Sequence, residues 1–140
     1  MNTDLMFSSK TDLWSTPQDF FDKLNDEFNF DLDPCCTREN AKCKKYFTIN
    51  EDGLKQSWEG RIVFCNPPYG KEIRKWVEKA HFESMKENTK VVMLIPARTD
   101  TSYFHDYIYN KVKEIRFIRG RLKFGKSKNS APFPSMVVVF

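Results

Sequence analysis

The chain has little glycine and histidine, and it has no long hydrophobic run. Five glycines and two histidines occur in 140 residues, and apolar runs extend over no more than five or six residues. Such runs are too short for a membrane-spanning helix, and the first ten residues lack the pattern of a secretory signal. The four cysteines form no CxxC pair, which argues against a zinc site and against a disulfide framework. We therefore expect a cytoplasmic protein that needs no metal and no membrane.

The composition favours one folded domain. Aromatic residues make up 15% of the chain, including thirteen phenylalanines, which argues against disorder. A length of 140 residues allows one domain with its own core and not two. No internal repeat or low-complexity linker is present. We predict a single domain over residues 1–140 in which residues 1–13 form a flexible N-terminal segment, and no obligatory protein partner is evident.

Charge is distributed unevenly, although the net charge is only +4. Residues 1–33 carry eight acidic side chains against two lysines, whereas residues 111–128 carry eight lysines and arginines against one glutamate. The basic block is interleaved with Phe117 and Phe124, which is typical of a surface that contacts phosphates. The alternative is a solvated surface that keeps the protein in solution.

Predicted strands alternate with predicted helices along most of the chain. Thr16 as N-cap and Pro17 at the first helical position predict a helix start. We predict helices at 17–28, 70–86 and 101–111, and strands at 30–33, 45–48, 61–65, 91–95, 115–118 and 136–140. This order predicts an α/β fold with a mostly parallel sheet and an antiparallel C-terminal edge, where two strands follow without a helix between them. A compact Rossmann-like fold is the expected architecture.

The most informative residues are Asn66, Pro67, Pro68 and Tyr69, which follow the apolar run 62–65. The Asn66 amide oxygen and the Pro67 carbonyl can each accept one N–H of an exocyclic amine. The two prolines stiffen the loop, and Tyr69 offers an aromatic face on which an extrahelical base can stack. The alternative is a proline-rich turn that merely ends a strand.

Asn-Pro-Pro-Tyr at a strand end resembles the catalytic motif of the S-adenosylmethionine-dependent amino methyltransferases. Read end to end, the chain from Trp14 to Phe140 is similar to the small phage-type DNA N6-adenine methyltransferases. The residues that carry this resemblance are Trp14-Ser15-Thr16-Pro17, Leu32-Asp33-Pro34-Cys35, Asp52-Gly53-Leu54, Asn66-Pro67-Pro68-Tyr69, Pro96-Ala97-Arg98-Thr99-Asp100 and Arg119-Gly120-Arg121-Leu122-Lys123-Phe124. The resemblance implies methyl transfer to adenine N6 in double-stranded DNA by a phage or prophage enzyme, often to escape restriction.

The same resemblance implies a cofactor site for S-adenosylmethionine. Asp33, followed by Pro34 and Cys35, stands where an acid accepts from the methionine ammonium of the cofactor. The glycine-rich turn that usually follows is missing, since Cys36-Thr37-Arg38 stands there, and glycine normally lets the backbone approach a ligand closely. The alternative for this stretch is a strand-ending Asp-Pro turn.

Two further segments complete the expected cofactor site. Trp14, Thr16 and Pro17 resemble the N-terminal element that folds over the cofactor, and Thr16 with the first-turn amides could hold the methionine carboxylate. A capped helix with a tryptophan on the core is the alternative. Asp52 is the expected partner of the ribose hydroxyls, although an exposed acidic turn fits the same residues.

DNA contacts are expected from four cations. Arg98 follows the strand after the catalytic one, and Arg119, Arg121 and Lys123 surround a predicted turn. Arginine can bind phosphates in a bidentate manner or stack on bases.

The chain has no evident Ser, Cys or His triad, and His81 and His105 are expected on helix faces. Two alternative functions remain. One is a catalytically weak or inactive DNA-binding relative, and the other is an amino methyltransferase acting on cytosine N4, RNA or protein glutamine. Asn at position 66 favours adenine over cytosine.

Overall fold

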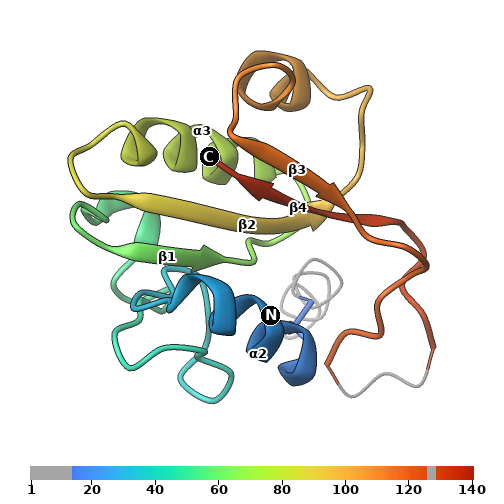
Figure 1. Cartoon of the computed structure of the whole chain (residues 1–140). Coiled ribbons are helices and arrows are strands. Elements are labelled where there is room, and N and C mark those ends of the chain that lie inside the picture. The colour runs from blue at the N-terminus through green and yellow to red at the C-terminus, as the bar shows by residue number, and fades with distance from the viewer. Residues whose placement is uncertain (1–13, 126–128) are drawn as a thin grey trace, which may run out of the picture.

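One mixed sheet of four strands lies at the centre of the protein (Figure 1). β1 (Ile62–Cys65) and β2 (Lys90–Pro96) are parallel, whereas β4 (Ser135–Val139) is antiparallel to β2 and to β3 (Glu114–Phe117). The strand order is β1-β2-β4-β3. The α/β class and the antiparallel C-terminal edge agree with the prediction. The mostly parallel sheet is not confirmed, because β4 lies between β2 and β3 and makes both of its pairs antiparallel.

The structure is a computed structural model, and it describes residues 14–125 and 129–140. The predicted flexible segment at 1–13 lies outside these ranges. Within them, no helix has the length and apolar character needed to span a membrane.

The parallel side of the sheet continues beyond β1 as single bridges. Leu32 pairs with Val63 and Asp33 pairs with Tyr46, both in parallel orientation. The predicted strands at 30–33 and 45–48 therefore occupy strand positions, but they form isolated bridges instead of ladders. Because parallel segments end at the same edge of a sheet, this pairing brings the residues after Asp33 close to those after β1.

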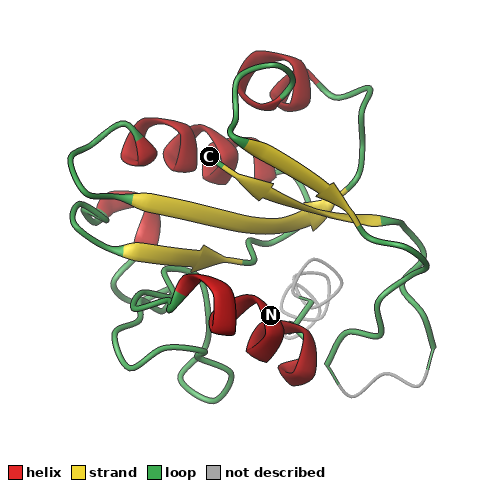
Figure 2. Ribbon diagram, in the orientation of Figure 1, coloured by secondary structure: helices red, strands yellow, loops and turns green. Residues whose placement is uncertain are grey.

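Two helices cover the sheet from opposite sides (Figure 2). α2 (Gln18–Phe28) buries Phe21, whose ring centroid lies 5.1 Å from that of Phe64 in β1. α3 (Ile73–Ser84) buries a separate apolar stripe that includes Val77 and Ala80. The 3.6-residue spacing of these apolar positions predicts both helices, and the core forms between each helix and the sheet.

The start of α2 differs from the prediction. Pro17 occupies the N-cap position, and no side chain caps the helix, so the predicted N-cap role of Thr16 is wrong. The Thr16 hydroxyl instead accepts a hydrogen bond from the Asn66 side chain. The other end of α2 is closed by Asn29, which adopts a left-handed conformation with φ of 58° and donates its N–H to the Asn25 carbonyl.

The predicted helix at 101–111 is much shorter in the structure. Residues 102–103 are α-helical, η2 (Phe104–Ile108) follows them as a π-helix, and the Tyr109 N–H bonds to the Phe104 carbonyl at 2.8 Å. Phe104 and Ile108 are both buried, so the apolar spacing is used although most of the segment is not regular α-helix. A one-residue widening of the turn keeps both side chains in the core.

Candidate active site

A pocket of about 770 Å³ lies at the edge where the parallel segments end. Its walls come from residues within 14–16, 33–42, 48–54 and 64–68, and from Trp76 of α3. Ligand sites of about 300–1,000 Å³ accommodate molecules of nucleoside or cofactor size. The location and the size both suit a ligand-binding crevice of an α/β protein.

Asn66 follows β1 directly, and both N–H groups of its amide are engaged. Nδ2 donates to the Trp14 carbonyl oxygen and to the Thr16 hydroxyl, the latter at 2.9 Å. A carbonyl oxygen can only accept, so it determines which end of the amide faces Trp14. Oδ1 is left buried and has no hydrogen-bond partner among the described residues. An unpaired buried acceptor costs about 1–3 kcal/mol, which a bound N–H group would offset.

The rest of the tetrapeptide divides between the pocket and the core. Pro68 lines the pocket, whereas Pro67 is buried and does not line it. Tyr69 is buried as well, and its hydroxyl donates to the Leu94 carbonyl at 3.0 Å. Burial raises the pKa of the Tyr69 phenol well above its ordinary value. The structure therefore brings Asn66 and Pro68 to the pocket and packs Tyr69 into the core.

The ring of Tyr69 belongs to an aromatic cluster. It makes edge contacts with Phe124 at 6.1 Å and with Phe133 at 5.5 Å, and Trp14 makes edge contacts with the same two phenylalanines. In this arrangement the Tyr69 ring is covered by protein instead of facing a space for a base. Phe124 follows the predicted DNA-binding segment, so the cluster connects that segment with the loop after β1.

Asp33, which forms the bridge to Tyr46, has a buried carboxylate. Oδ2 accepts from the Lys42 N–H at 3.0 Å, and Oδ1 accepts from the Cys35 N–H at 3.3 Å. Burial raises the pKa of Asp33 from its ordinary value of 3.8 to about 6, and the two backbone N–H groups counteract this only in part. No ion pair reaches Asp33 from the described residues. A cation bound in the pocket would stabilise its charged form.

Asp52 reaches the same pocket because of an exceptionally close backbone contact. Gly53 packs against Pro34, and a Cβ at position 53 would lie 2.0 Å from the Pro34 carbonyl oxygen. Asp52 itself adopts φ of 58°, and its Oδ1 accepts from the Leu54 N–H at 3.1 Å. Glycine at this position therefore allows the two acid-bearing loops to meet at one pocket.

The loop that lacks glycine is held by its own side chains. The Thr37 N–H donates to the Asn40 side-chain oxygen at 2.7 Å, and the Asn40 N–H donates to the Thr37 hydroxyl at 3.2 Å. The Asn40 amide also donates to the Ser15 hydroxyl at 3.0 Å. None of the residues in 35–41 adopts a positive φ, so this loop follows a path that does not require glycine.

Most of the predicted cofactor residues line the pocket. Those that do are Trp14, Thr16, Asp33, Pro34, Cys35 and Asp52. Pro17 does not line the pocket and instead occupies the N-cap position of α2.

The predicted DNA-binding cations lie outside the pocket and are exposed. Arg98 lies 5.9 Å from the centre of the Phe133 ring. Arg119, Arg121 and Lys123 precede Phe124, and within the described ranges none of these four cations forms an ion pair. Their charges are therefore available to an external anion.

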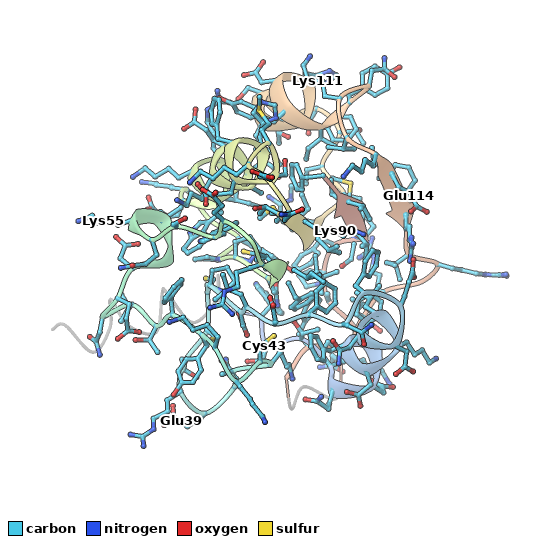
Figure 3. The ribbon with its side chains drawn as sticks, turned by 60° about the vertical axis from the view of Figure 1, so that its left-hand side comes forward. Glu39, Cys43, Lys55, Lys90, Lys111 and Glu114 are labelled. Atoms are coloured by element: carbon cyan, nitrogen blue, oxygen red, sulfur yellow. The ribbon has the colours of Figure 1, made fainter. Side chains whose placement is uncertain are left out.

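The basic block at 111–128 does not act as one surface. Arg116 is held by both carboxylate oxygens of Glu27, at 2.8 and 2.6 Å, and by Glu114. Lys111 lies at the opposite end of the molecule from Glu39, which lines the pocket (Figure 3). Residues 126–128 are outside the described ranges. The charge pattern alone therefore overestimates how many of these cations lie near the site.

Several pocket residues were not predicted. Thr48, Ile49 and Asn50 line the pocket, and Ile49 is 92% exposed. They follow the predicted strand at 45–48, so the rule that ligands bind at carboxyl ends could have identified them. Trp76 also lines the pocket from α3, and no local signal in the sequence distinguishes it from other core residues.

The described residues contain no group of three or more His, Cys, Asp or Glu side chains that could hold a metal ion. Cys35 and Cys36 line the pocket as free thiols, and burial together with the Asp33 charge raises the pKa of both. They are therefore protonated and poor nucleophiles.

Fold and site together define a class of protein. A pocket at the carboxyl ends of parallel segments is lined by Asn66, whose amide oxygen has no partner among the described residues, and by four acidic side chains that include Asp33 and Asp52. This arrangement suits an enzyme that positions an amine beside a polar cofactor. Comparison with known proteins identifies the class. Residues 4–140 match the family model described as DNA N-6-adenine-methyltransferase (Dam).

Individual relatives agree with the family match. The chain is 34% identical over 140 residues to a DNA N-6-adenine-methyltransferase of Haemophilus phage HP1, covering 94% of this chain and 80% of the relative. It is 34% identical over 106 residues to the enzyme of the same name from Escherichia phage T1, covering 74% of this chain but 44% of that relative. A putative methyltransferase of Escherichia coli K12, YfdM, is 37% identical over 65 residues, covering 41% of this chain and 71% of the relative.

The chain belongs to the DNA N-6-adenine-methyltransferase family. The predicted family and the predicted enzyme class, an adenine-specific DNA methyltransferase, are confirmed.

Proposed function

We propose that the 770 Å³ pocket binds S-adenosylmethionine together with an adenine extruded from double-stranded DNA, and that Asn66 aligns the N6 amino group for methylation. The unpaired Oδ1 of Asn66 is the observation that supports this proposal most strongly. A polar atom that is buried without a partner in the free protein indicates a bound partner in the working complex. The adenine N6 group supplies the N–H that this oxygen lacks.

The pocket residues fit the polar ends of the cofactor. Asp33 would accept from the methionine ammonium, and Asp52 from the ribose hydroxyls. Trp14, Thr16, Pro34 and Cys35 would surround the methionine portion, and Pro17, which does not line the pocket, would act by fixing the start of α2 behind Thr16. The cofactor supplies an electrophilic methyl group on sulfur when it is bound. The raised pKa of Asp33 supports this assignment, because a buried carboxylate without a cation gains most from an ammonium partner. These assignments favour the Rossmann-like methyltransferase architecture.

At the amine, the work of the protein is alignment and not covalent catalysis. Asn66 Oδ1 would accept one N–H of adenine N6, and the Pro67 carbonyl would accept the other. Two acceptors in different directions orient the nitrogen lone pair, and orientation of this kind lowers the barrier of a bimolecular step. The rigid diproline keeps both acceptors in place.

Capture of the base against Tyr69 requires movement of the aromatic cluster. Phe124 and Phe133 cover the Tyr69 ring in this structure. An adenine must leave the duplex before its amino group can be reached. We therefore place the stacking step after a displacement of Phe124, which directly follows the cations proposed to bind the DNA backbone, namely Arg119, Arg121 and Lys123, with Arg98 nearby on the Phe133 ring.

The test is direct identification of the product. The protein is incubated with labelled S-adenosylmethionine and plasmid DNA, and the nucleosides are analysed by mass spectrometry. We expect N6-methyladenine from the wild type and none from Asn66→Ala, while calorimetry shows that the variant still binds the cofactor. N4-methylcytosine as the product would favour the cytosine alternative. Duplex binding without any heat of cofactor binding would favour an inactive relative and overturn the proposal.

The setting of the reaction is also a proposal. Two of the relatives belong to phages and one to a bacterium. We place the reaction in the bacterial cytoplasm, where an enzyme encoded by a phage or prophage meets both DNA and cofactor.

A further inference from the structure

We propose that Thr16 is a positioning residue, whose hydroxyl fixes the orientation of the Asn66 amide and so keeps Oδ1 directed at the substrate amine. This inference rests on the proposed function and goes beyond it, because the sequence predicted Thr16 as a helix cap and a cofactor contact and not as a partner of Asn66. The observation behind it is the 2.9 Å hydrogen bond from Asn66 Nδ2 to Thr16 Oγ1.

The valences of the amide explain why the hydroxyl matters. An asparagine side chain has two N–H donors. The Trp14 carbonyl accepts one of them, and Thr16 accepts the other. With both donors used, the amide cannot turn over without losing two hydrogen bonds and placing its oxygen against the Trp14 carbonyl oxygen. The substrate-facing position is therefore left to Oδ1.

Little solvent reaches the hydroxyl, although Thr16 lines the pocket. Thr16 is only 6% exposed, and Asn66 Oδ1 is itself buried. If the hydroxyl is removed, one amide N–H becomes a buried donor without a partner, and this penalty is relieved only when the amide rotates away. Engaged donors also polarise the amide, which makes its oxygen a stronger acceptor.

Thr16 can position Asn66 and contact the cofactor at the same time, and experiments can distinguish the two roles. A hydroxyl has one hydrogen and two lone pairs. Accepting from Asn66 uses a lone pair and leaves the hydrogen free for the methionine carboxylate. Loss of the cofactor contact changes the affinity for S-adenosylmethionine, whereas loss of the Asn66 contact lowers the rate of methyl transfer when cofactor and DNA are both saturating.

The experiment compares single-turnover rates in Thr16→Val and Thr16→Ser. We expect Thr16→Val to lower the rate at saturation on the order of 10-fold, since an orienting hydrogen bond is lost and a donor is stranded. Thr16→Ser keeps the hydroxyl and restores the rate. Thr89→Val is the matched control, because the Thr89 hydroxyl is also buried and accepts from the Gly60 N–H at 2.8 Å, but outside the pocket. This control should leave the rate unchanged.

A second measurement does not depend on activity. In protein labelled with ¹⁵N-asparagine, the side-chain NH2 signal of Asn66 is assigned by its absence from Asn66→Ala. We expect this signal to exchange slowly with water in the wild type, and on the order of 10-fold faster in Thr16→Val. Thr16→Ser should retain the slow exchange.

The outcomes separate the two proposals. A rate at saturation that is unchanged in Thr16→Val overturns the positioning role, while N6-methyladenine formation by the wild type leaves the proposed function intact. An equal loss of rate in Thr89→Val, or no rescue by Thr16→Ser, also overturns it, because the effect is then general. A wild type that methylates no adenine overturns the proposed function. If the exchange of the Asn66 amide still depends on Thr16 in that case, the hydrogen bond is present and only the proposed function has failed.

Discussion

Replacement of Asp33 by asparagine provides the sharpest test of the proposed cofactor site. In the folded protein, burial outweighs the hydrogen bonds to this carboxyl and raises its pKa to about 6, compared with an ordinary value of 3.8. Folding therefore favours the protonated form, and the stabilising effect of protonation is complete below pH 3.8 and is lost as the pH rises through about 6. The difference between the two pKa values corresponds to about 3 kcal/mol.

The effect of the Asp33 pKa on stability can be measured by comparing the free energy of unfolding at two pH values. Asparagine cannot ionise, so Asp33→Asn removes the free-energy cost of burying a charged carboxylate, and this cost depends on pH. We expect the free energy of unfolding of the variant, relative to wild type, to increase by about 2.5 kcal/mol between pH 4 and pH 8, because a small part of the change is already complete at pH 4. The loss of one acceptor for the Lys42 or Cys35 N–H lowers the stability of the variant at every pH and cancels in this comparison. Guanidinium unfolding, followed by tryptophan fluorescence, measures both curves.

Cofactor binding gives the second half of the test. An ammonium beside Asp33 stabilises its charged form, so the affinity of the wild type for S-adenosylmethionine should rise as the pH increases from 5 through about 6 to about 7, where the α-amino group of the cofactor is still charged. In Asp33→Asn the affinity should be lower and nearly independent of pH in this interval. Two unfolding curves that remain parallel from pH 4 to pH 8 would refute the reasoning about burial. A pH-independent affinity in the wild type would refute the contact with the ammonium.

Two further predictions concern the loops and the surface. Gly53→Ala should lower the melting temperature and weaken cofactor binding, because its Cβ would lie 2.0 Å from the Pro34 carbonyl oxygen and the loops must separate; a melting temperature within error of wild type would contradict this close contact. Arg121→Ala should reduce the slope of log affinity for DNA against log salt by about 1, as expected for one lost phosphate contact. Arg116→Ala should leave that slope unchanged, because Arg116 is already paired with Glu27; equal slopes for the two variants would contradict the assignment.

The parts of the site that follow strand ends could be predicted from sequence. Asn66 comes directly after a short apolar run, and Asp33 ends another, so the rule for parallel segments placed both at one edge. The bridges that pair Leu32 with Val63 and Asp33 with Tyr46 confirm that placement. The order of β4 and β3 was harder to predict, because register and neighbours depend on the whole sheet and not on the local pattern.

The environment of Tyr69 and Thr16 could not be predicted, since it depends on contacts between distant segments. A tyrosine after two prolines has the same local sequence whether its ring faces a pocket or packs beneath Phe124 and Phe133. Thr-Pro before a helix is typical of an N-cap, yet the hydroxyl of Thr16 bonds to a side chain fifty residues away. Local propensity predicted the helix, but tertiary packing decided the use of the hydroxyl.

Residues 14–16 show how the parts of the site depend on one another. Trp14 and Thr16 hold the Asn66 amide, the Ser15 hydroxyl accepts from Asn40 in the glycine-free loop, and the Ser15 carbonyl accepts from the Gly125 N–H at 2.8 Å. These three residues thus contact the loop after β1, the loop at 35–41 and the segment after the basic residues. Because none of the three residues belongs to the sheet, the position of the Asn66 amide depends on a short stretch that these hydrogen bonds and the contacts of the Trp14 ring with Phe124 and Phe133 hold in place.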